Sequence, residues 1–345
     1  MSRKKRVMLI AAICVIVGAL LCVAAMASVG FDLNNLNTTQ YRTRTIDITE
    51  KFSDISISAG STDVCILPSD DGVCSVVSVE EPDAPNSASV ENGALIVAAS
   101  ARGGHWYESI GINFGVEAWP SVTIYLPESV YGDLSCKTAG GDVSAASGLT
   151  FAAADITTDS GEVCFDASAV GEARICTASG DVTSDGASAN TLLVRTTSGG
   201  VRVTSPDAAQ IELHSTSSDV SLTDASMPGM LTAETTSGDI TITRAKASSA
   251  SVKAVSGDVS ALELYAVGRL SVQTTSGEIS LTHCDGDTLA LTSASGDVSG
   301  SLTSYKNFSV RTTSGDVDVP PSVLDAGACD IQTTSGDVSL AVSAN

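Results

Sequence analysis

A column of regularly spaced carboxylates is the feature of this sequence that could do chemistry most directly. The tetrapeptide Ser-Gly-Asp-Val, or a near copy, returns eleven times between Gly141 and Gly336, at intervals of 19 to 21 residues. In ten of these repeats the residue after the central position is acidic: Asp142, Glu162, Asp181, Asp219, Asp239, Asp258, Glu278, Asp297, Asp316 and Asp337. Carboxylate oxygens are ligands that suit Ca²⁺. The column could therefore hold calcium between repeats, with Asp239, Asp258, Asp297, Asp316 and Asp337 as the candidate ligands.

A structural role for the same carboxylates competes with calcium. Carboxylates about 5 Å apart in a stack repel one another by roughly 1 kcal/mol per pair in water, so some interaction must offset them. Backbone N–H groups of the acid's own turn could do so, as in Asx turns. The known calcium-binding solenoid repeat has nine residues and is rich in Gly-Gly, unlike this one. Turn bonding is the favoured interpretation, with calcium as the alternative, and no other cofactor is expected.

Catalysis is not indicated. The acids are spread evenly along the repeats, and the three histidines, His105, His214 and His283, are far apart in the sequence. No Ser or Cys stands beside a plausible general base. We therefore expect no catalytic residue and interpret His214 as a solvated surface residue. A polysaccharide-active enzyme is only the third functional hypothesis.

An aromatic loop is the best local candidate for binding. Residues 102–120 contain both tryptophans and four of the 14 aromatic residues, including Trp106, Tyr107 and Trp119. The loop could be a hydrophobic plug that closes the first coil, which is the favoured interpretation. The alternative is that Trp106, Tyr107 and Trp119 bind a sugar or a protein partner.

The elements that position these residues follow from the repeat. The residue two positions after the centre is Val or Ile in all eleven repeats, and the residue five positions before it is always apolar. Apolar sites two residues apart within a segment share one face of a strand. Each repeat therefore predicts a strand, a tight turn whose Gly has a positive φ, a second strand and a looser corner.

Stacking these units predicts an all-β fold, a single-stranded parallel β-solenoid of about eleven coils. Thr, Ser or Ala three positions before the centre should point inward. The outward column four positions before the centre is chemically mixed, which argues against an ice-binding threonine array. It reads Lys137, Thr157, Cys176, Arg195, His214, Glu234, Lys253, Gln273, Thr292, Arg311 and Gln332.

The ends of the predicted solenoid, which spans residues 134–345, differ from its body. Residues 45–133 form a less regular β lead-in that caps the first coil, and Cys65 and Cys74 could pair there across a hairpin. The last coil finishes at Leu340. Because an uncovered coil exposes strand edges, we expect self-association or a partner at this C-terminal coil.

The N-terminal segment predicts a membrane anchor. A basic head, residues 1–6, precedes an uncharged apolar run over residues 7–31 that is long enough to span a bilayer. The positive head places the N-terminus in the cytoplasm and the body, after a polar stalk at 32–44, outside the cell. Cleavage of a signal peptide after Ala27 is the alternative. The formal net charge of −22 disfavours nucleic acid as a partner.

Repeated Thr-Thr-Ser-Gly-Asp-Val motifs at 312–317 and 333–338, with Tyr-Leu-Pro at 125–127, resemble the bacterial putative-adhesin family of unknown function. The resemblance covers about residues 45–345 and carries no catalytic residues. It implies a membrane-anchored extracellular solenoid that binds a cell-envelope glycan or surface protein, as an adhesin or envelope scaffold. The alternative is the ectodomain of an envelope-stress sensing system.

Overall fold

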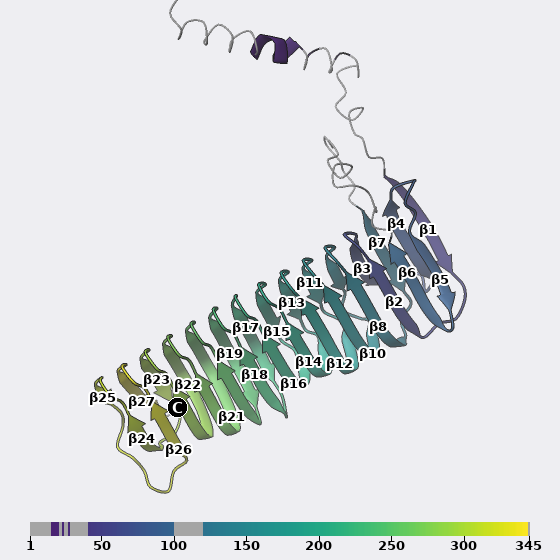
Figure 1. Ribbon diagram of the computed structural model, residues 1–345. Coiled ribbons are helices and arrows are strands. Elements are labelled where there is room, and N and C mark those ends of the chain that lie inside the picture. The colour runs from purple at the N-terminus through teal and green to yellow at the C-terminus, as the bar shows by residue number, and fades with distance from the viewer. Residues whose placement is uncertain (1–14, 21–22, 24–26, 28–40, 100–119, 344–345) are drawn as a thin grey trace, which may run out of the picture.

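The computed structural model describes residues 15–20, 23, 27, 41–99 and 120–343. Residues 41–99 and 120–343 form one elongated stack of β-coils, with the lead-in at one end and the last repeats at the other (Figure 1). The predicted all-β parallel solenoid is confirmed.

Each repeat contributes one strand to each of two long faces. On the first face the strands follow one another in this order: β5 (Ser87–Glu91), β6 (Ala94–Ala99), β2 (Asp54–Ala59), β8 (Val130–Thr138), β10 (Thr150–Thr158), β12 (Ser168–Thr177), β14 (Ser188–Arg195), β16 (Asp207–His214), β18 (Met230–Glu234), β20 (Ser249–Lys253), the ends of β21 (Val259–Gln273) and β22 (Ile279–Thr292), β26 (Ala328–Gln332) and β24 (Asn307–Arg311). Apart from β5, these strands are parallel, as stacked coils require.

The second face follows the turn. Its order is β1 (Arg42–Ile48), β4 (Cys74–Glu80), β7 (Ser121–Leu126), β3 (Asp63–Pro68), β9 (Val143–Ala145), β11 (Val163–Phe165), β13 (Val182–Asp185), β15 (Val201–Thr204), β17 (Val220–Ser226), β19 (Ile240–Ala247), the starts of β21 and β22, β23 (Val298–Leu302), β27 (Val338–Val342) and β25 (Val317–Asp318). The inward residues of both faces form continuous buried columns of Val, Ile and Leu.

The turn glycines have a different cause from the predicted one. Among those that the structure describes, only Gly315 has a positive φ, of 156°. The others are required because successive turns lie directly against one another. A Cβ on Gly257 would lie 1.7 Å from the carbonyl oxygen of Gly238, and one on Gly180 would lie 1.8 Å from that of Gly161. The prediction of positive φ is therefore wrong, and close backbone stacking replaces it.

The N-terminal end contains a coil that the repeat pattern missed. Strands β2 and β3 form a full coil between β6–β7 and β8–β9. Its turn carries Thr62 at the Gly position and Asp63 at the acidic position, and Asp63 Oδ1 accepts a hydrogen bond of 2.9 Å from Asp142 N. At this end, β5 is the edge strand of the first face and β1 is the edge strand of the second face. Each pairs antiparallel with its neighbour, β5 with β6 and β1 with β4. The buried Glu80 carboxylate holds β1 by accepting hydrogen bonds from Arg42 at 3.0 and 3.2 Å.

The C-terminal end is also out of sequence order. Strand β26 lies between β22 and β24, and β27 lies between β23 and β25. In the stack, the last repeat of the sequence, β26 and β27, therefore lies before the penultimate repeat, β24 and β25. The penultimate repeat forms the terminal coil. On the free side of β24, Phe308 N donates to Ser322 Oγ at 3.0 Å and Lys306 O accepts from Val323 N at 3.1 Å. The expectation that the coil ending at Leu340 is the exposed one is wrong.

A buried ion pair accompanies this rearrangement. Lys306 Nζ lies 2.7 Å from Asp285 Oδ1 and donates to Gly286 O at 2.6 Å, and only 5 % of its side chain is exposed. Partial burial raises the pKa of the Asp285 carboxyl, but hydrogen bonds from Lys306, Ser304 and Thr303 outweigh it and leave the pKa below its usual value. The pair joins the segment before β24 to the corner of β22.

The predicted hairpin disulfide is absent. Strand β7 lies between β3 and β4, so Cys65 and Cys74 are on strands that do not pair. All seven cysteines in the described part of the chain are free thiols. Burial raises the pKa of Cys136 and Cys329 to about 12 and that of Cys74 to about 11, which makes these thiols poor nucleophiles.

We therefore expect a maleimide to modify Cys65, Cys164 and Cys176 in the folded protein. The buried Cys74, Cys136, Cys284 and Cys329 should react only after unfolding. Peptide mass spectrometry before and after denaturation measures the difference. Rapid native labelling of Cys136 would contradict the packing of the buried columns.

Most of the predicted membrane segment, 7–31, lies outside the described residues. Residues 15–20, 23 and 27 are helical. Within the described part of the chain, no helix combines the length and apolar character that crossing a bilayer requires.

Candidate functional site

The acidic column joins successive coils. Each aspartate in the column except Asp316 of the terminal coil accepts a hydrogen bond from the backbone N–H at the equivalent position of the next coil. Examples are Asp219 Oδ1 to Asp239 N, Asp239 Oδ1 to Asp258 N and Asp258 Oδ1 to Glu278 N, all at 2.8 Å. The expected partner, an N–H of the acid's own turn, is therefore wrong. The interaction between coils is the one that offsets the repulsion between stacked carboxylates.

The ladder follows the spatial order of the coils at the C-terminal end. Asp297 Oδ1 accepts from Asp337 N, and Asp337 Oδ1 accepts from Asp316 N, both at 2.8 Å. Where Glu278 stands in the column, its carboxylate accepts instead from Ser299 Oγ at 3.1 Å. One oxygen of each aspartate before the terminal coil is thus used in holding the stack together.

A second polar ladder lies inside the turns. The inward Thr or Ser accepts a hydrogen bond from the Gly N–H of its own turn and donates to the Gly carbonyl of the preceding coil. Gly199 N donates to Thr196 Oγ1 at 2.9 Å, and Thr196 Oγ1 donates to Gly180 O at 3.4 Å. The inward orientation predicted for this column is confirmed. Its hydroxyls satisfy backbone groups that the tight turn would otherwise bury unpaired.

Calcium dependence can be tested against this arrangement. Among the described residues, no group of three or more His, Cys, Asp or Glu side chains is placed to hold a metal ion. Because backbone N–H groups already bind the aspartates, we expect the unfolding midpoint to be the same in EDTA and in excess Ca²⁺. A higher midpoint in Ca²⁺ would support the calcium hypothesis for Asp239, Asp258, Asp297, Asp316 and Asp337.

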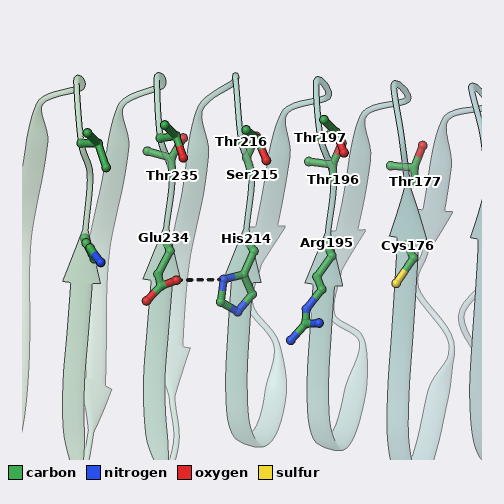
Figure 2. Close-up of a pocket in the computed structure, with 13 residues that line it drawn as sticks. Cys176, Thr177, Arg195, Thr196, Thr197, His214, Ser215, Thr216, Glu234 and Thr235 are labelled. Carbon is green, nitrogen blue, oxygen red and sulfur yellow. Dashed lines mark ion pairs between the residues drawn. The ribbon is translucent and has the colours of Figure 1, made fainter.

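A groove runs along the first face beside the turns. Its central stretch has a volume of about 480 Å³ and is bordered by the outward column and by the Thr and Ser residues of the turns (Figure 2). A further stretch of about 440 Å³ continues from Lys253 to the terminal coil. Figure 2 shows Cys176, Arg195, His214 and Glu234 in one row, parallel to the row of turn hydroxyls. The outward column and the turns together make one long polar surface.

The groove is basic although the protein is strongly acidic. Its lining includes Arg195, Lys253 and Arg311, and Glu234 is its only acidic residue in the described part of the chain. The chain as a whole has a formal net charge of −22. The acidic ladder follows the Gly of each turn and does not line the groove. The acidic ladder and the groove cations Arg195, Lys253 and Arg311 therefore lie on different sides of the turns.

His214 lies between two carboxylates. Its Nδ1 lies 3.4 Å from Glu234 Oε2 and its Nε2 lies 3.9 Å from Glu212 Oε2, while Nε2 is buried without a hydrogen-bond partner. His214 was predicted to be a solvated surface residue, and its side chain is 25 % exposed, so it is only partly solvated.

The aromatic loop cannot be assigned a place in the site. Trp106, Tyr107 and Trp119 lie outside the described residues, so both interpretations of that loop stay predictions. The groove is the site that sequence analysis missed. The sequence pattern that could have revealed the groove is the outward column. Its basic residues alternate with uncharged and acidic ones, so the column was interpreted only as chemically mixed.

The family model described as Toastrack DUF4097 matches residues 52–266 and 262–344. No curated protein sequence matches the chain.

Several solved structures are similar. One, from Parabacteroides distasonis, is titled a "putative lipid binding protein" and has a TM-score of 0.42 at 15 % identity, covering 87 % of this chain and 98 % of its own. A "putative adhesin" from Bacteroides fragilis has a TM-score of 0.36 at 15 % identity, with 87 % and 97 % covered. Another "putative adhesin", from Parabacteroides merdae, has a TM-score of 0.37 at 10 % identity, with 88 % and 97 % covered.

Proposed function

Because the chain belongs to the Toastrack DUF4097 family, we propose that it is a non-catalytic binding protein, an adhesin or cell-envelope scaffold whose ligand lies in the groove. The observation that carries the proposal is the groove itself: a long polar surface on a stack of coils, with hydrophilic side chains at every rung. Such a surface makes the same kind of contact many times. It therefore suits an extended ligand better than a small substrate.

The backbone holds the groove in a fixed shape. The Gly turns, the inward hydroxyls and the aspartate ladder each bond one coil to the next beside it. A surface that is ordered before binding loses little conformational entropy when the ligand arrives. The fold thus supports recognition without requiring any moving part.

The location that we propose is the cell membrane, with the body outside the cell. The support is the sequence order of a basic head, an apolar run and then an acidic body. The proposed partners are a cell-envelope glycan or a surface protein. Self-association at the C-terminal end stays a proposal. The surface that we propose for it is the terminal coil formed by β24 and β25 and the loop after it, where Val317 and Leu324 are exposed.

A capture experiment tests the proposal. The full-length chain in detergent is immobilised and incubated with envelope fractions, beside the variant Arg195→Gln/Lys253→Gln. We expect the wild type to retain envelope material that the variant loses. Equal retention by both proteins would show that the groove is not the binding surface. Release of reducing ends from envelope glycans would contradict the non-catalytic assignment.

A further inference from the structure

We infer that the groove takes a linear anionic glycan polymer, whose carboxylate or phosphate groups meet cations spaced along the stack. The inference rests on the proposed function and names the ligand class of that same groove.

The sign of the charge is the first argument. Arg195, Lys253 and Arg311 line the groove against the single acid Glu234, which lies within reach of His214. On a protein of net charge −22, these side chains give the groove a local excess of cations. Guanidinium and ammonium groups bind carboxylates and phosphates through charge-assisted hydrogen bonds. The complementary ligand is anionic.

The spacing of the cations is the second argument. Strand pairing aligns Lys137, Arg195 and Lys253 in one column, each three rungs from the next. At about 4.8 Å per rung the cations are about 14 Å apart. In space Arg311 follows Lys253 after four rungs, because Gln332 is inserted between Thr292 and Arg311. A compact anion would meet one cation, whereas a chain along the axis would meet several.

The side chains between the cations are the third argument. Thr197, Thr216 and Thr236 line the groove at successive rungs and are exposed. Hydroxyl groups both donate and accept, as sugar hydroxyls require of a binding surface. Among the described lining residues, none is aromatic, and protein interfaces usually depend on aromatic anchors. The composition therefore favours a polar polymer over a protein partner.

The test uses defined polymers and the full-length chain in detergent. The probes are polygalacturonate for carboxylate, poly(glycerol phosphate) for phosphate and dextran as the neutral control, with affinity measured by biolayer interferometry. The groove variant Arg195→Gln/Lys253→Gln is compared with Arg202→Gln/Lys246→Gln, which removes two exposed cations from the opposite face. Circular dichroism confirms that both variants are folded.

We expect an anionic polymer to bind, with the preferred probe distinguishing carboxylate from phosphate. The groove variant should bind about tenfold more weakly, while the opposite-face variant stays within about twofold of the wild type. Galacturonate oligomers long enough to reach from Arg195 to Lys253 should bind more tightly than shorter ones. Dextran binding as tight as that of the anionic polymers would overturn the inference, as would an equal loss in both variants. Capture of envelope material without binding of either anionic polymer would overturn this inference and leave the proposed function standing.

Discussion

Replacement of Gly257 by alanine is expected to lower the free energy of unfolding by about 3 kcal/mol, because the new methyl group has no room. An ideal Cβ at this position lies 1.7 Å from Gly238 O and 2.4 Å from Gly238 C. Both atoms are backbone, so no side chain can rotate away. Relief requires two coils to separate, which would stretch the hydrogen bond from Asp258 N to Asp239 Oδ1. Urea unfolding followed by circular dichroism measures the loss.

The matched control is Gly200→Ala. Gly200 lies one residue beyond the turn glycine Gly199, and the atoms nearest to its Cβ position are 3.6 Å away, which is ordinary contact. Alanine there should leave stability within about 0.5 kcal/mol of the wild type. Ser218 occupies the glycine column naturally, so Ser218→Gly should not destabilise the stack. If Gly257→Ala and Gly200→Ala were equally stable, close packing of the turns would not be the reason for the glycines.

Replacement of Lys306 by methionine is expected to cost about 3 kcal/mol, at the low end of the range for breaking a buried pair. The substitution leaves the Asp285 carboxylate, of whose side chain 19 % is exposed, without its cation, and leaves Gly286 O without this donor. Hydrogen exchange should show the loss in β24–β27 and not in the central coils, because repeat proteins unfold locally. Lys246→Met, which removes an exposed lysine, is the control and should be neutral.

The same pair predicts a dependence on pH. The pKa of Asp285 is lower in the folded protein than its usual value, so its contribution is complete above the unfolded pKa of about 3.9. That contribution is lost as the pH falls through the folded pKa. Protection of the C-terminal coils should therefore fall below about pH 4 in the wild type. A pH response at the C-terminal coils of Lys306→Met identical to that of the wild type would contradict the role of the pair.

The body of the solenoid could be predicted from sequence because one residue type recurs at each structural position. Val or Ile recurs two residues after the centre, as at Val259 and Ile279. Stacking the coils is what places these side chains in one buried column. The inward Thr and the strand–turn–strand unit follow from the same repeat. Where the pattern is strictly periodic, the neighbours of a residue are known before the structure is.

The ends could not be predicted, because strand order there depends on contacts between distant residues. Thr62 and Asp63 lie 79 residues before their partners Gly141 and Asp142, so their coil falls outside the 19–21-residue period. The insertion of β26 and β27 depends in the same way on tertiary packing, including the Lys306–Asp285 pair. Hydrogen bonds between coils were missed for a simpler reason: sequence shows which residues stack but not which atoms meet.

The groove was visible in the sequence only as a column of unlike residues. Its identity as a site depends on two facts of geometry, the hollow beside the turns and the separation of Arg195 and Lys253 from the acidic ladder. Neither fact follows from composition, which is acidic overall. The local charge of a repeat protein must be counted column by column.

Site-directed cross-linking tests the central claim, binding in the groove, most directly. A photoreactive amino acid replaces Thr216 in the groove or Thr241 on the opposite face, both of which are exposed positions. The full-length chain is then illuminated after it has captured envelope material. Our account predicts a cross-linked product from position 216 and none from position 241. Cross-linking from position 241 alone, or equally from both, would contradict it.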